Sequence, residues 1–438
     1  MKARYPSSRL IVVSADGLRP DVYLRANELG LKIPNLRRLV STGASAQAVT
    51  TVYPSTTYPA HATLVTGVLP REHGIYSHLA SLDPTEKARP WSWFARAINV
   101  PTLWDVARAS GRRSAGVGWP VSAGAAIDYN LPEIWNPALP DPHQDFETVA
   151  RHSTPHLFEQ VLKALGPLAP GAPKRPSQAA QALNPDRLRA EGALFLWQRY
   201  SPDLLLLHLV FYDHQAHHYG PLARESLAAV EQTDYEIGRM WDVAQEDGNV
   251  TLVVLSDHGF VPVSRDAAPL VVLLDEGLFT KKADGSLELK RLGAIHAGGS
   301  FAIYWLEEPK PDDRRRLEKA IRRLEASGAV AEIVDRGRLE RLGADPDAEL
   351  ILEAAPDHYF SDRFRAPEVR EAVEDRGTHG NLPSTPGLEA AFIAVGPGVA
   401  AGKKLGRIEL AQVAPTLARL LGLPVGILAS NAEPLDLS

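Results

Sequence analysis

The chain has 438 residues, a formal net charge of −6, 45% apolar residues, 23% charged residues and no cysteine. This length exceeds one ordinary core, so we expect either one large domain with an inserted subdomain or two domains. The acidic balance argues against a nucleic-acid scaffold, which needs a basic face. The absence of cysteine excludes both a disulfide framework and every zinc–thiolate site.

The first half of the chain alternates predicted strands and helices. A β-branched run predicts the first strand, and a helix with Pro34 near its start ends just before Gly43. A second strand, the beginning of a helix, a further helix stopped by Gly111 and a short strand follow. In chain order these predicted elements are Leu10–Ser14, the helix between Pro34 and Gly43, Ala48–Tyr53, His61–Gly67, Pro101–Ser110 and Ser114–Gly118.

The second half contains the clearest buried strands, Leu204–Val210 and Thr251–Ser256, which are continuous aliphatic runs. Such runs are typical of a parallel sheet covered on both faces. Phe392–Val395 predicts another strand, and Ile408–Leu421 predicts a closing amphipathic helix. The fold class is therefore α/β, with a mostly parallel central sheet flanked by helices. Ligands of such sheets bind beyond the carboxyl ends of the strands.

Two stretches interrupt this alternation. Gly166–Pro185 is rich in Pro, Ala and Gly and predicts a surface linker. Residues 261–365 predict a small α+β insertion, which divides the remaining catalytic core into 1–260 and 366–438. Its predicted elements are the hairpin-like segments Ser286–Leu292 and Ser300–Trp305, a charged helix at Asp312–Ser327, and strands near Ala329–Val334 and Leu350–Glu353.

The apolar runs are too short to span a membrane, so we expect no transmembrane segment. Met1–Leu10 contains basic residues but no apolar h-region, so we expect no signal peptide in this chain. This leaves a cytoplasmic protein, or a periplasmic or secreted one if a signal has been removed.

Carboxylates and imidazoles follow the buried strands. Asp16 ends the first strand and precedes Gly17, where an Asp also serves as a turn or cap residue. Asp257, His258 and Gly259 occupy the same place after the Thr251–Ser256 run. Adjacent Asp and His with a Gly that permits close backbone approach favour a metal site.

A second set lies farther along the chain. Asp213 and His217 are four residues apart beyond the Leu204–Val210 run, which places both side chains on one helical face. His379 lies in a Gly-flanked turn. The other histidines are interpreted as flanking, structural or surface residues: His61, His73, His143, His152, His156, His208, His214, His218, His296 and His358.

Taken together, three carboxylates and three imidazoles supply three ligands for each of two ions. Such ligands without thiolate suit Zn²⁺, with Mn²⁺ or Fe as alternatives. Three ligands leave open coordination positions, which are typical of a catalytic site. Two ions ~4 Å apart would clamp the attacking and leaving oxygens of a phosphoryl displacement.

The nucleophile is expected in the segment from Tyr53 to His61, where two prolines precede a helix. A helix N-terminus favours an anion, and metal coordination activates a hydroxyl. The residues themselves do not choose among Ser55, Thr56 and Thr57, which also suit capping and turns. Nearby, Tyr58 and the segment Trp91–Phe94 either stack on a nucleobase or aryl group or pack beneath the sheet.

These stretches resemble the nucleotide pyrophosphatase/phosphodiesterase family (type I phosphodiesterases) of the alkaline-phosphatase superfamily. The resemblance spans nearly the whole chain in the right order. It is carried by Val12–Gly17, the Pro-Ser-Thr-Thr-Tyr-Pro-Ala-His stretch ending at His61, Thr66–Gly67, His73–Ile75, Pro101–Trp104, Trp119–Pro120, the Asp213-x-x-x-His217 segment through Pro221, Ser256–Gly259 and Gly377–Gly380.

The resemblance implies an alkaline-phosphatase-like fold and makes Thr57 the nucleophile. One zinc would be held by Asp213, His217 and His379. The other would be held by Asp16, Asp257 and His258, with Thr57 completing it. The implied reaction is a two-step displacement through a phosphothreonine intermediate.

One position departs from the family pattern. Family members carry an Asn a few residues after the His-Gly-Ile turn, where it donates to a phosphoryl oxygen, and His78 occupies that position here. An imidazole also donates one hydrogen bond and adds positive charge when protonated. His78 therefore joins Thr57 as a candidate catalytic residue and Tyr58 as a candidate substrate-binding residue, and it favours charged monoesters if it is protonated.

The sequence thus predicts a two-metal hydrolase of small-molecule phosphate esters or nucleotides, acting as a phosphodiesterase or nucleotide pyrophosphatase. The alternative enzymes are a phosphomonoesterase of alkaline-phosphatase type and a phosphonate hydrolase. A sulfatase is disfavoured because the Cys/Ser-x-Pro-x-Arg motif is absent. The alternative from another class is a phosphate-ligand-binding protein, which has no need of a nucleophile.

Overall fold

The structure is a computed structural model that describes residues 9–84, 86, 88–139, 145–165, 185–283, 285–289, 291–372 and 375–438. The predicted linker Gly166–Pro185 and His143 lie outside the described residues, except that Pro185 begins helix α9 (Pro185–Tyr200). In the described part of the chain, no helix combines the length and the apolar character that crossing a membrane requires.

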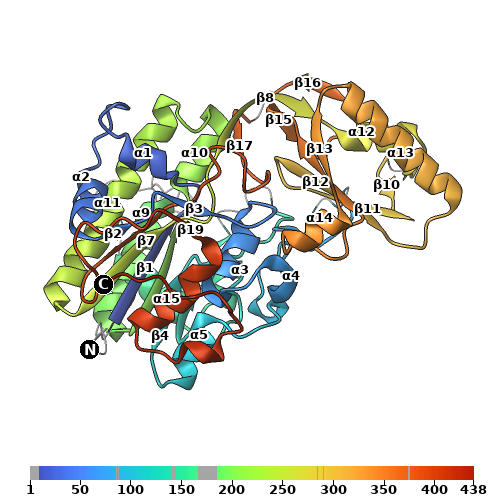
Figure 1. Cartoon of the computed structure of the whole chain (residues 1–438). Helices are drawn as coiled ribbons and strands as arrows, with labels where there is room; N and C mark the ends of the chain where they lie inside the picture. The colour runs from blue at the N-terminus through green and yellow to red at the C-terminus, as the bar shows by residue number, and fades with distance from the viewer. Residues whose placement is uncertain are drawn as a thin grey trace.

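A seven-stranded sheet forms the centre of the larger lobe, in the order β2-β18-β7-β1-β6-β4-β5 (Figure 1). The strands β1, β4, β5, β6 and β7 pair in parallel, whereas β18 is antiparallel to β7 and β2. The predicted mostly parallel sheet is confirmed. Its strands are β1 (Arg9–Ala15), β2 (Ala44–Ser45), β4 (Ser114–Val117), β5 (Tyr129–Leu131), β6 (Leu204–Leu209), β7 (Val250–Leu255) and β18 (Phe392–Val395).

Alternate residues of the sheet enter different cores. In β1, Ile11 and Val13 pack on one face, and Leu10 and Val12 pack on the other. Helices α2 (Pro34–Thr42), α9 and α11 (Arg224–Asp247) cover the first face, and α3 (Thr57–Thr66), α5 (Leu103–Ala109) and α15 (Val413–Leu420) cover the second (Figure 1). Burial on both faces explains why these strands are continuously aliphatic. The other helices of this lobe are α1 (Pro20–Leu24), α4 (Pro70–His73), η1 (Ala95–Ala97), α6 (Phe146–His152), α7 (Leu157–Leu165), α10 (Phe211–Tyr219), η3 (Leu410–Gln412) and η4 (Val425–Ile427).

Three predicted boundaries were wrong. Helix α3 begins at Thr57 rather than near His61, because Pro59 lies in the first turn, where its missing N–H is not needed. The strand expected at Ala48–Tyr53 is only β3 (Ala48–Thr50), which pairs with β19 (Arg407–Glu409) outside the main sheet. The closing helix therefore starts later than expected, at Val413, because the chain from 407 first forms β19.

The smaller lobe lies at the upper right of Figure 1. Its four-stranded sheet has the order β11-β12-β14-β13, and a separate apolar core packs this sheet against α12 (Pro269–Asp275) and α13 (Pro311–Ala326). Strand β8 (Val261–Ala267) pairs with β15, β16 and β17 and links the lobes. The remaining elements are β9 (Thr280–Lys281), β10 (Leu287–Glu288), β11 (Leu292–His296), β12 (Ser300–Trp305), β13 (Val330–Asp335), α14 (Arg336–Arg341), β14 (Leu350–Ala354), β15 (Asp357–Phe360), β16 (Val369–Glu371) and β17 (Gly377–Thr378). Residues 261–365 as a separate insertion remain a prediction.

Candidate active site

The ends of two neighbouring strands place the first group of candidate ligands. In the parallel pair β1 and β7, Ser14 is in register with Leu255, so Asp16 and the Asp257–His258 pair emerge at the same edge of the sheet. His258 Nε2 lies 3.2 Å from Asp257 Oδ2 and 3.5 Å from Asp16 Oδ1. The two carboxylates and the imidazole therefore converge, although Asp16 lies far from the other two in the chain.

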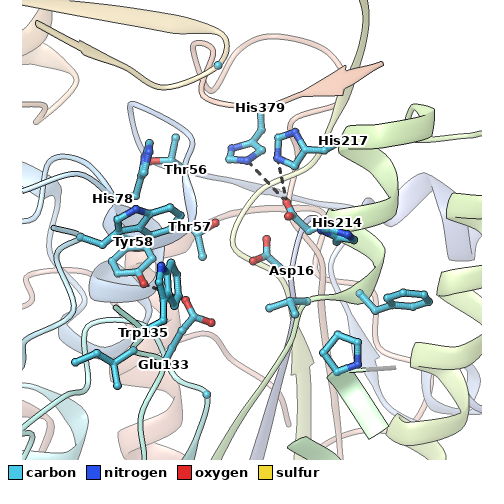
Figure 2. A pocket seen from close by; sticks show the side chains of 18 of the residues that line it. Asp16, Thr56, Thr57, Tyr58, His78, Glu133, Trp135, His214, His217 and His379 are labelled. Carbon is cyan, nitrogen blue, oxygen red and sulfur yellow. Dashed lines mark hydrogen bonds and ion pairs between the residues drawn. The ribbon is translucent and has the colours of Figure 1, made fainter. Parts of the chain in front are cut away.

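Helix α10 places the second group. It follows β6, and its four-residue spacing does put Asp213 and His217 on one face, with His217 Nε2 3.8 Å from Asp213 Oδ1. His379, just after β17, presents its own Nε2 3.8 Å from the same oxygen. Figure 2 shows both rings directed at this carboxylate. His214, on the same helix, also lines the cavity, and its ring lies against that of His218 at 4.8 Å.

The turn that carries His379 depends on glycine. Gly380 has a φ of +94°, and a Cβ atom there would lie 1.7 Å from the carbonyl oxygen of Ala297. Only glycine therefore permits this approach. The Gly380 N–H donates to the Ser55 carbonyl at 2.9 Å, and this bond joins the His379 turn to the loop that precedes α3.

All three imidazoles make the same kind of hydrogen bond, from Nδ1 to a backbone carbonyl. The Nδ1 atoms of His217, His258 and His379 lie 3.2, 3.0 and 3.0 Å from the backbone carbonyls of Gly377, Gly259 and Ser55. A carbonyl only accepts, so each Nδ1 carries a hydrogen, and in a neutral ring the lone pair is then on Nε2. This arrangement is typical of metal-ligating histidines. Burial and the nearby His258 and His217 lower the pKa of His379 well below its ordinary value, so that ring is neutral.

One oxygen of each carboxylate also lacks a hydrogen-bond partner among the described residues. Asp16 Oδ1, Asp213 Oδ1 and Asp257 Oδ2 are buried and accept no hydrogen bond in the described part of the chain. Burial and the neighbouring Asp257 and Asp213 raise the pKa of Asp16 well above its ordinary value. Buried polar atoms are normally satisfied. Three unsatisfied carboxylate oxygens facing three imidazole lone pairs therefore fit cations better than they fit one another.

The distances test this fit. Bonds of ~2.0 Å and a tetrahedral angle separate two ligand atoms of one zinc ion by about 3.3 Å. The separations of 3.2 and 3.5 Å around His258 Nε2 match this value, and the 3.8 Å separations around Asp213 Oδ1 are slightly wider. Ligand atoms of Asp213 also lie within 4.8 Å of those of Asp16 and His258, so Asp213 stands between the two groups.

Among Ser55, Thr56 and Thr57, Thr57 is the residue whose hydroxyl contacts one of these ligand atoms. Its Oγ1 lies 3.3 Å from His258 Nε2, at the first residue of α3. Ser55 instead donates to the carbonyl of Asn381 at 2.7 Å and is fully buried, and Thr56 Oγ1 is buried without a partner in the described chain. His61, interpreted from the sequence as structural, fixes this turn: its Nδ1 lies 2.8 Å from the Thr57 carbonyl and its Nε2 lies 2.9 Å from Ser14 Oγ.

A cavity of about 1500 Å³ opens over Asp16 and Thr57. Tyr58, Trp91 and Trp135 form an aromatic part of its wall, with ring centroids 5.4 Å apart for the first two and 4.7 Å apart for the second two. Trp93, in contrast, is buried against Trp135. The sequence left open whether this segment stacks on a ligand or packs; its residues divide between the cavity wall and the core.

His78 also lines this cavity and lies against Trp91, with ring centroids 4.7 Å apart (Figure 2). Burial and the neighbouring His296 and Arg89 lower the pKa of His78 to about 3. The ring is therefore neutral near pH 7. It retains one hydrogen to donate but lacks the positive charge that the sequence argument for monoesters required.

The comparisons with known proteins show the family and the fold. The sequence profile of the family described as type I phosphodiesterase / nucleotide pyrophosphatase matches residues 10–381. The chain belongs to this family. Its fold matches that of an inactive variant of murine ectonucleotide pyrophosphatase / phosphodiesterase 5 in complex with AMP, with a TM-score of 0.65, 18% identity and 97% coverage of each chain.

The relatives that match in sequence are longer proteins, of which this chain covers only a part. A Schizosaccharomyces pombe protein described as an uncharacterized pyrophosphatase/phosphodiesterase is 24% identical, over 95% of this chain and 77% of that protein. Venom phosphodiesterase 2 of Crotalus adamanteus is 26% identical, over 60% of this chain and 28% of the venom protein. Ectonucleotide pyrophosphatase/phosphodiesterase family member 1 of Rattus norvegicus is 26% identical, over 59% of this chain and 24% of the rat protein. The chain thus spans about a quarter of the venom and rat proteins.

Proposed function

We propose that this member of the family is a hydrolase that uses two divalent cations to cleave phosphodiesters or nucleotide pyrophosphates. The observation that carries the proposal is that His217, His258 and His379 all use Nδ1 to contact a backbone carbonyl. Their Nε2 atoms therefore face buried carboxylate oxygens that accept no hydrogen bond in the described chain. With neutral rings and no cations, this arrangement would set lone pair against lone pair in a desolvated space.

The proposed ligand groups follow the geometry. Asp213, His217 and His379 would hold one ion, and Asp16, Asp257 and His258 would hold the other. Zinc suits this donor set of carboxylate and imidazole, with manganese or iron as alternatives. Bound cations would neutralise charge on the phosphoryl group and lower the pKa of a coordinated hydroxyl.

Thr57 is the proposed nucleophile because its Oγ1 lies 3.3 Å from a ligand atom, His258 Nε2. The threonine oxygen attacks phosphorus, and the bond from phosphorus to the leaving oxygen breaks as that oxygen takes a proton. Water then attacks the phosphothreonine, releases a phosphate monoester and restores the hydroxyl of Thr57.

The cavity favours a substrate with a second substituent on phosphorus. It extends from Thr57 to the partly exposed rings of Trp91 and Trp135, on which a nucleobase or another flat apolar group can lie, and the buried Tyr58 packs against Trp91. His78 is proposed to donate one hydrogen bond to the phosphoryl group from this wall. A neutral His78 gives the site no added preference for doubly charged monoesters.

The test is turnover of a matched pair of chromogenic esters, a nucleotide-type phosphodiester and a phosphomonoester, by protein that has been stripped of metal and then restored with zinc. We expect faster diester hydrolysis that chelator abolishes. Preference for the monoester would assign a phosphomonoesterase, and metal-dependent turnover of a phosphonate alone would assign a phosphonate hydrolase. Zinc binding without turnover of any of the three would leave a phosphate-ligand-binding protein.

A further inference from the structure

His208 lies inside β6, fully buried, between two acidic side chains. Its Nε2 lies 3.1 Å from Asp16 Oδ2. Its Nδ1 lies 3.2 Å from Glu133 Oε2 and 3.1 Å from the carbonyl oxygen of Gly118. Since oxygen acceptors face both ring nitrogens, the ring donates to Asp16 on one side and to Glu133 or Gly118 on the other.

This contact orients Asp16. His208 occupies Oδ2 of the carboxylate, which leaves Oδ1 as the oxygen that points toward His258 Nε2, 3.5 Å away, and accepts no hydrogen bond in the described chain. A half turn of the carboxylate only exchanges two equivalent oxygens, but a quarter turn would break the hydrogen bond to His208 and would turn the other oxygen away from His258 Nε2. The donor on His208 is therefore what holds the plane of the carboxylate toward the proposed metal site.

Glu133 in turn holds His208. Its Oε2 accepts from Arg189 Nη2 at 2.9 Å, and its Oε1 accepts from the Tyr58 hydroxyl at 3.0 Å. Arg189 Nη1, 3.2 Å from His208 Nδ1, donates to the carbonyl of His208 at 3.1 Å. Three donors thus converge on one buried carboxylate, which lies beneath Tyr58 at the cavity wall (Figure 2). The network runs from Asp16 to the residue that follows Thr57.

We propose that His208, held by Glu133, is a positioning residue for the ion bound through Asp16. This inference rests on the proposed function, because it takes Asp16 as a metal ligand. A hydrogen bond to the outer oxygen of a ligating carboxylate fixes the direction of the inner oxygen and limits the rotation that would release the ion. His208 acts through Asp16 and does not touch the ion or the substrate.

Two substitutions test the hydrogen bonds of the two ring nitrogens of His208 separately. The amide nitrogen of glutamine reaches the place of Nε2, so His208→Gln keeps a donor for Asp16. The amide nitrogen of asparagine reaches only the place of Nδ1, so His208→Asn keeps a donor for Glu133 and loses the one for Asp16. The measurement is zinc affinity of the full-length apo protein, by titration against a competing chelator.

The wild-type chain is expected to bind two zinc ions. His208→Asn should weaken one of them by about 10- to 100-fold, the same ion that Asp16→Asn removes, whereas His208→Gln should stay within a few-fold of wild type. The ion lost in His217→Ala should be unaffected in His208→Asn. Thr251→Val, which removes a buried hydrogen bond to Pro397 elsewhere in the sheet, is the matched control and should leave both affinities unchanged.

The results of these titrations distinguish a failure of the inference about His208 from a failure of the proposed function. Equal zinc affinities in His208→Asn and wild type, or equal losses in the Asn and Gln variants, would overturn the inference while two bound ions would still support the proposed function. A wild-type chain that binds no zinc would overturn both. If His208→Asn does not fold, Glu133→Gln tests the same network, because a loosened His208 should weaken the same ion about tenfold; an unchanged affinity there would overturn the inference.

Discussion

The rings of His258 and His379 stack in parallel, with centroids 3.8 Å apart and an angle of 14° between their planes. One ring follows a strand of the main sheet, and the other follows a strand paired with β8 of the smaller lobe. The Nδ1 of His258 donates to the carbonyl of Gly259, and the Nδ1 of His379 donates to the carbonyl of Ser55. The two Nε2 atoms therefore face the carboxylates side by side. The stack therefore places one ligand of each proposed metal group at the boundary between the lobes.

Zinc should stabilise the folded chain. Asp16, Asp213 and Asp257 are held together at this edge of the sheet, and cations relieve their mutual repulsion. At free zinc 100-fold above its Kd, each ion adds about 2.7 kcal/mol to the free energy of unfolding. Thermal unfolding with chelator and with added zinc measures this effect. Asp213→Asn should remove part of the zinc-dependent rise; an identical midpoint in chelator and in zinc would contradict two bound ions.

Removing the Thr57 hydroxyl should abolish turnover but not metal binding. Thr57→Ala is expected to lower kcat on the chromogenic diester by at least about a thousandfold, because the covalent step loses its nucleophile. Zinc content should remain at the wild-type level. Thr57→Ser, which retains a hydroxyl, is the matched variant and should keep measurable turnover and a trapped phosphoenzyme after acid quench. Wild-type turnover in Thr57→Ala would exclude it as the nucleophile.

Gly380→Ala should displace His379, since a Cβ atom there would lie 1.7 Å from the Ala297 carbonyl. Gly111 is the matched control: it also has a positive φ, of +69°, but, its two chain neighbours aside, no atom of the described residues lies within 4 Å of an added Cβ. Gly111→Ala should cost about 1 kcal/mol, from backbone strain alone. We expect Gly380→Ala to cost at least about 2 kcal/mol more and to loosen one zinc ion. Equal free energies of unfolding in the two variants would contradict this reading of the turn.

Glu353 should make stability depend on pH. Burial raises its pKa to about 7 from 4.5, although hydrogen bonds from Leu382 N and Tyr53 Oη oppose part of the shift. Between these two pH values the folded chain holds a proton that the unfolded chain has lost, so the free energy of unfolding falls as pH rises from about 4.5 to about 7.

The effect can be isolated by comparing wild type with Glu353→Gln, which cannot titrate. Relative to that variant, the wild type should lose roughly 3 kcal/mol of stability between pH 4.5 and pH 8. Denaturant unfolding in chelator at several pH values measures this difference. A difference that is constant over the whole range would show that Glu353 has an ordinary pKa in the folded chain.

His78→Asn should leave the monoester-to-diester ratio of kcat/KM within a few-fold of wild type. The pKa of His78 is lowered to about 3, so both side chains are neutral donors near pH 7. His78→Phe, which removes the donor and keeps a ring, should lower turnover of both esters. A tenfold or greater rise in diester preference in His78→Asn would show that the histidine is charged in the enzyme with substrate.

The chain pattern alone predicted the sheet and which carboxylates and imidazoles would follow its strands. Continuous aliphatic runs such as Leu204–Leu209 and Val250–Leu255 are typical of a parallel sheet covered on both faces, and in such a sheet the polar residues that follow parallel strands lie at one edge. The spacing of Asp213 and His217 needed only a helix to bring them together. Resemblance then singled out Thr57 among three adjacent hydroxyls.

The roles of His208 and His78 depend on residues that are distant from them in the sequence. His208 was interpreted as a structural or surface residue because nothing near it in the chain reveals that Asp16 and Glu133 lie on either side of its ring. The charge of His78 depended on burial against Trp91, which local pattern does not specify. Short-range periodicity reports which residues are buried and in what element, but hydrogen-bond partners and pKa values depend on which segments the topology packs together, and only the tertiary structure provides that.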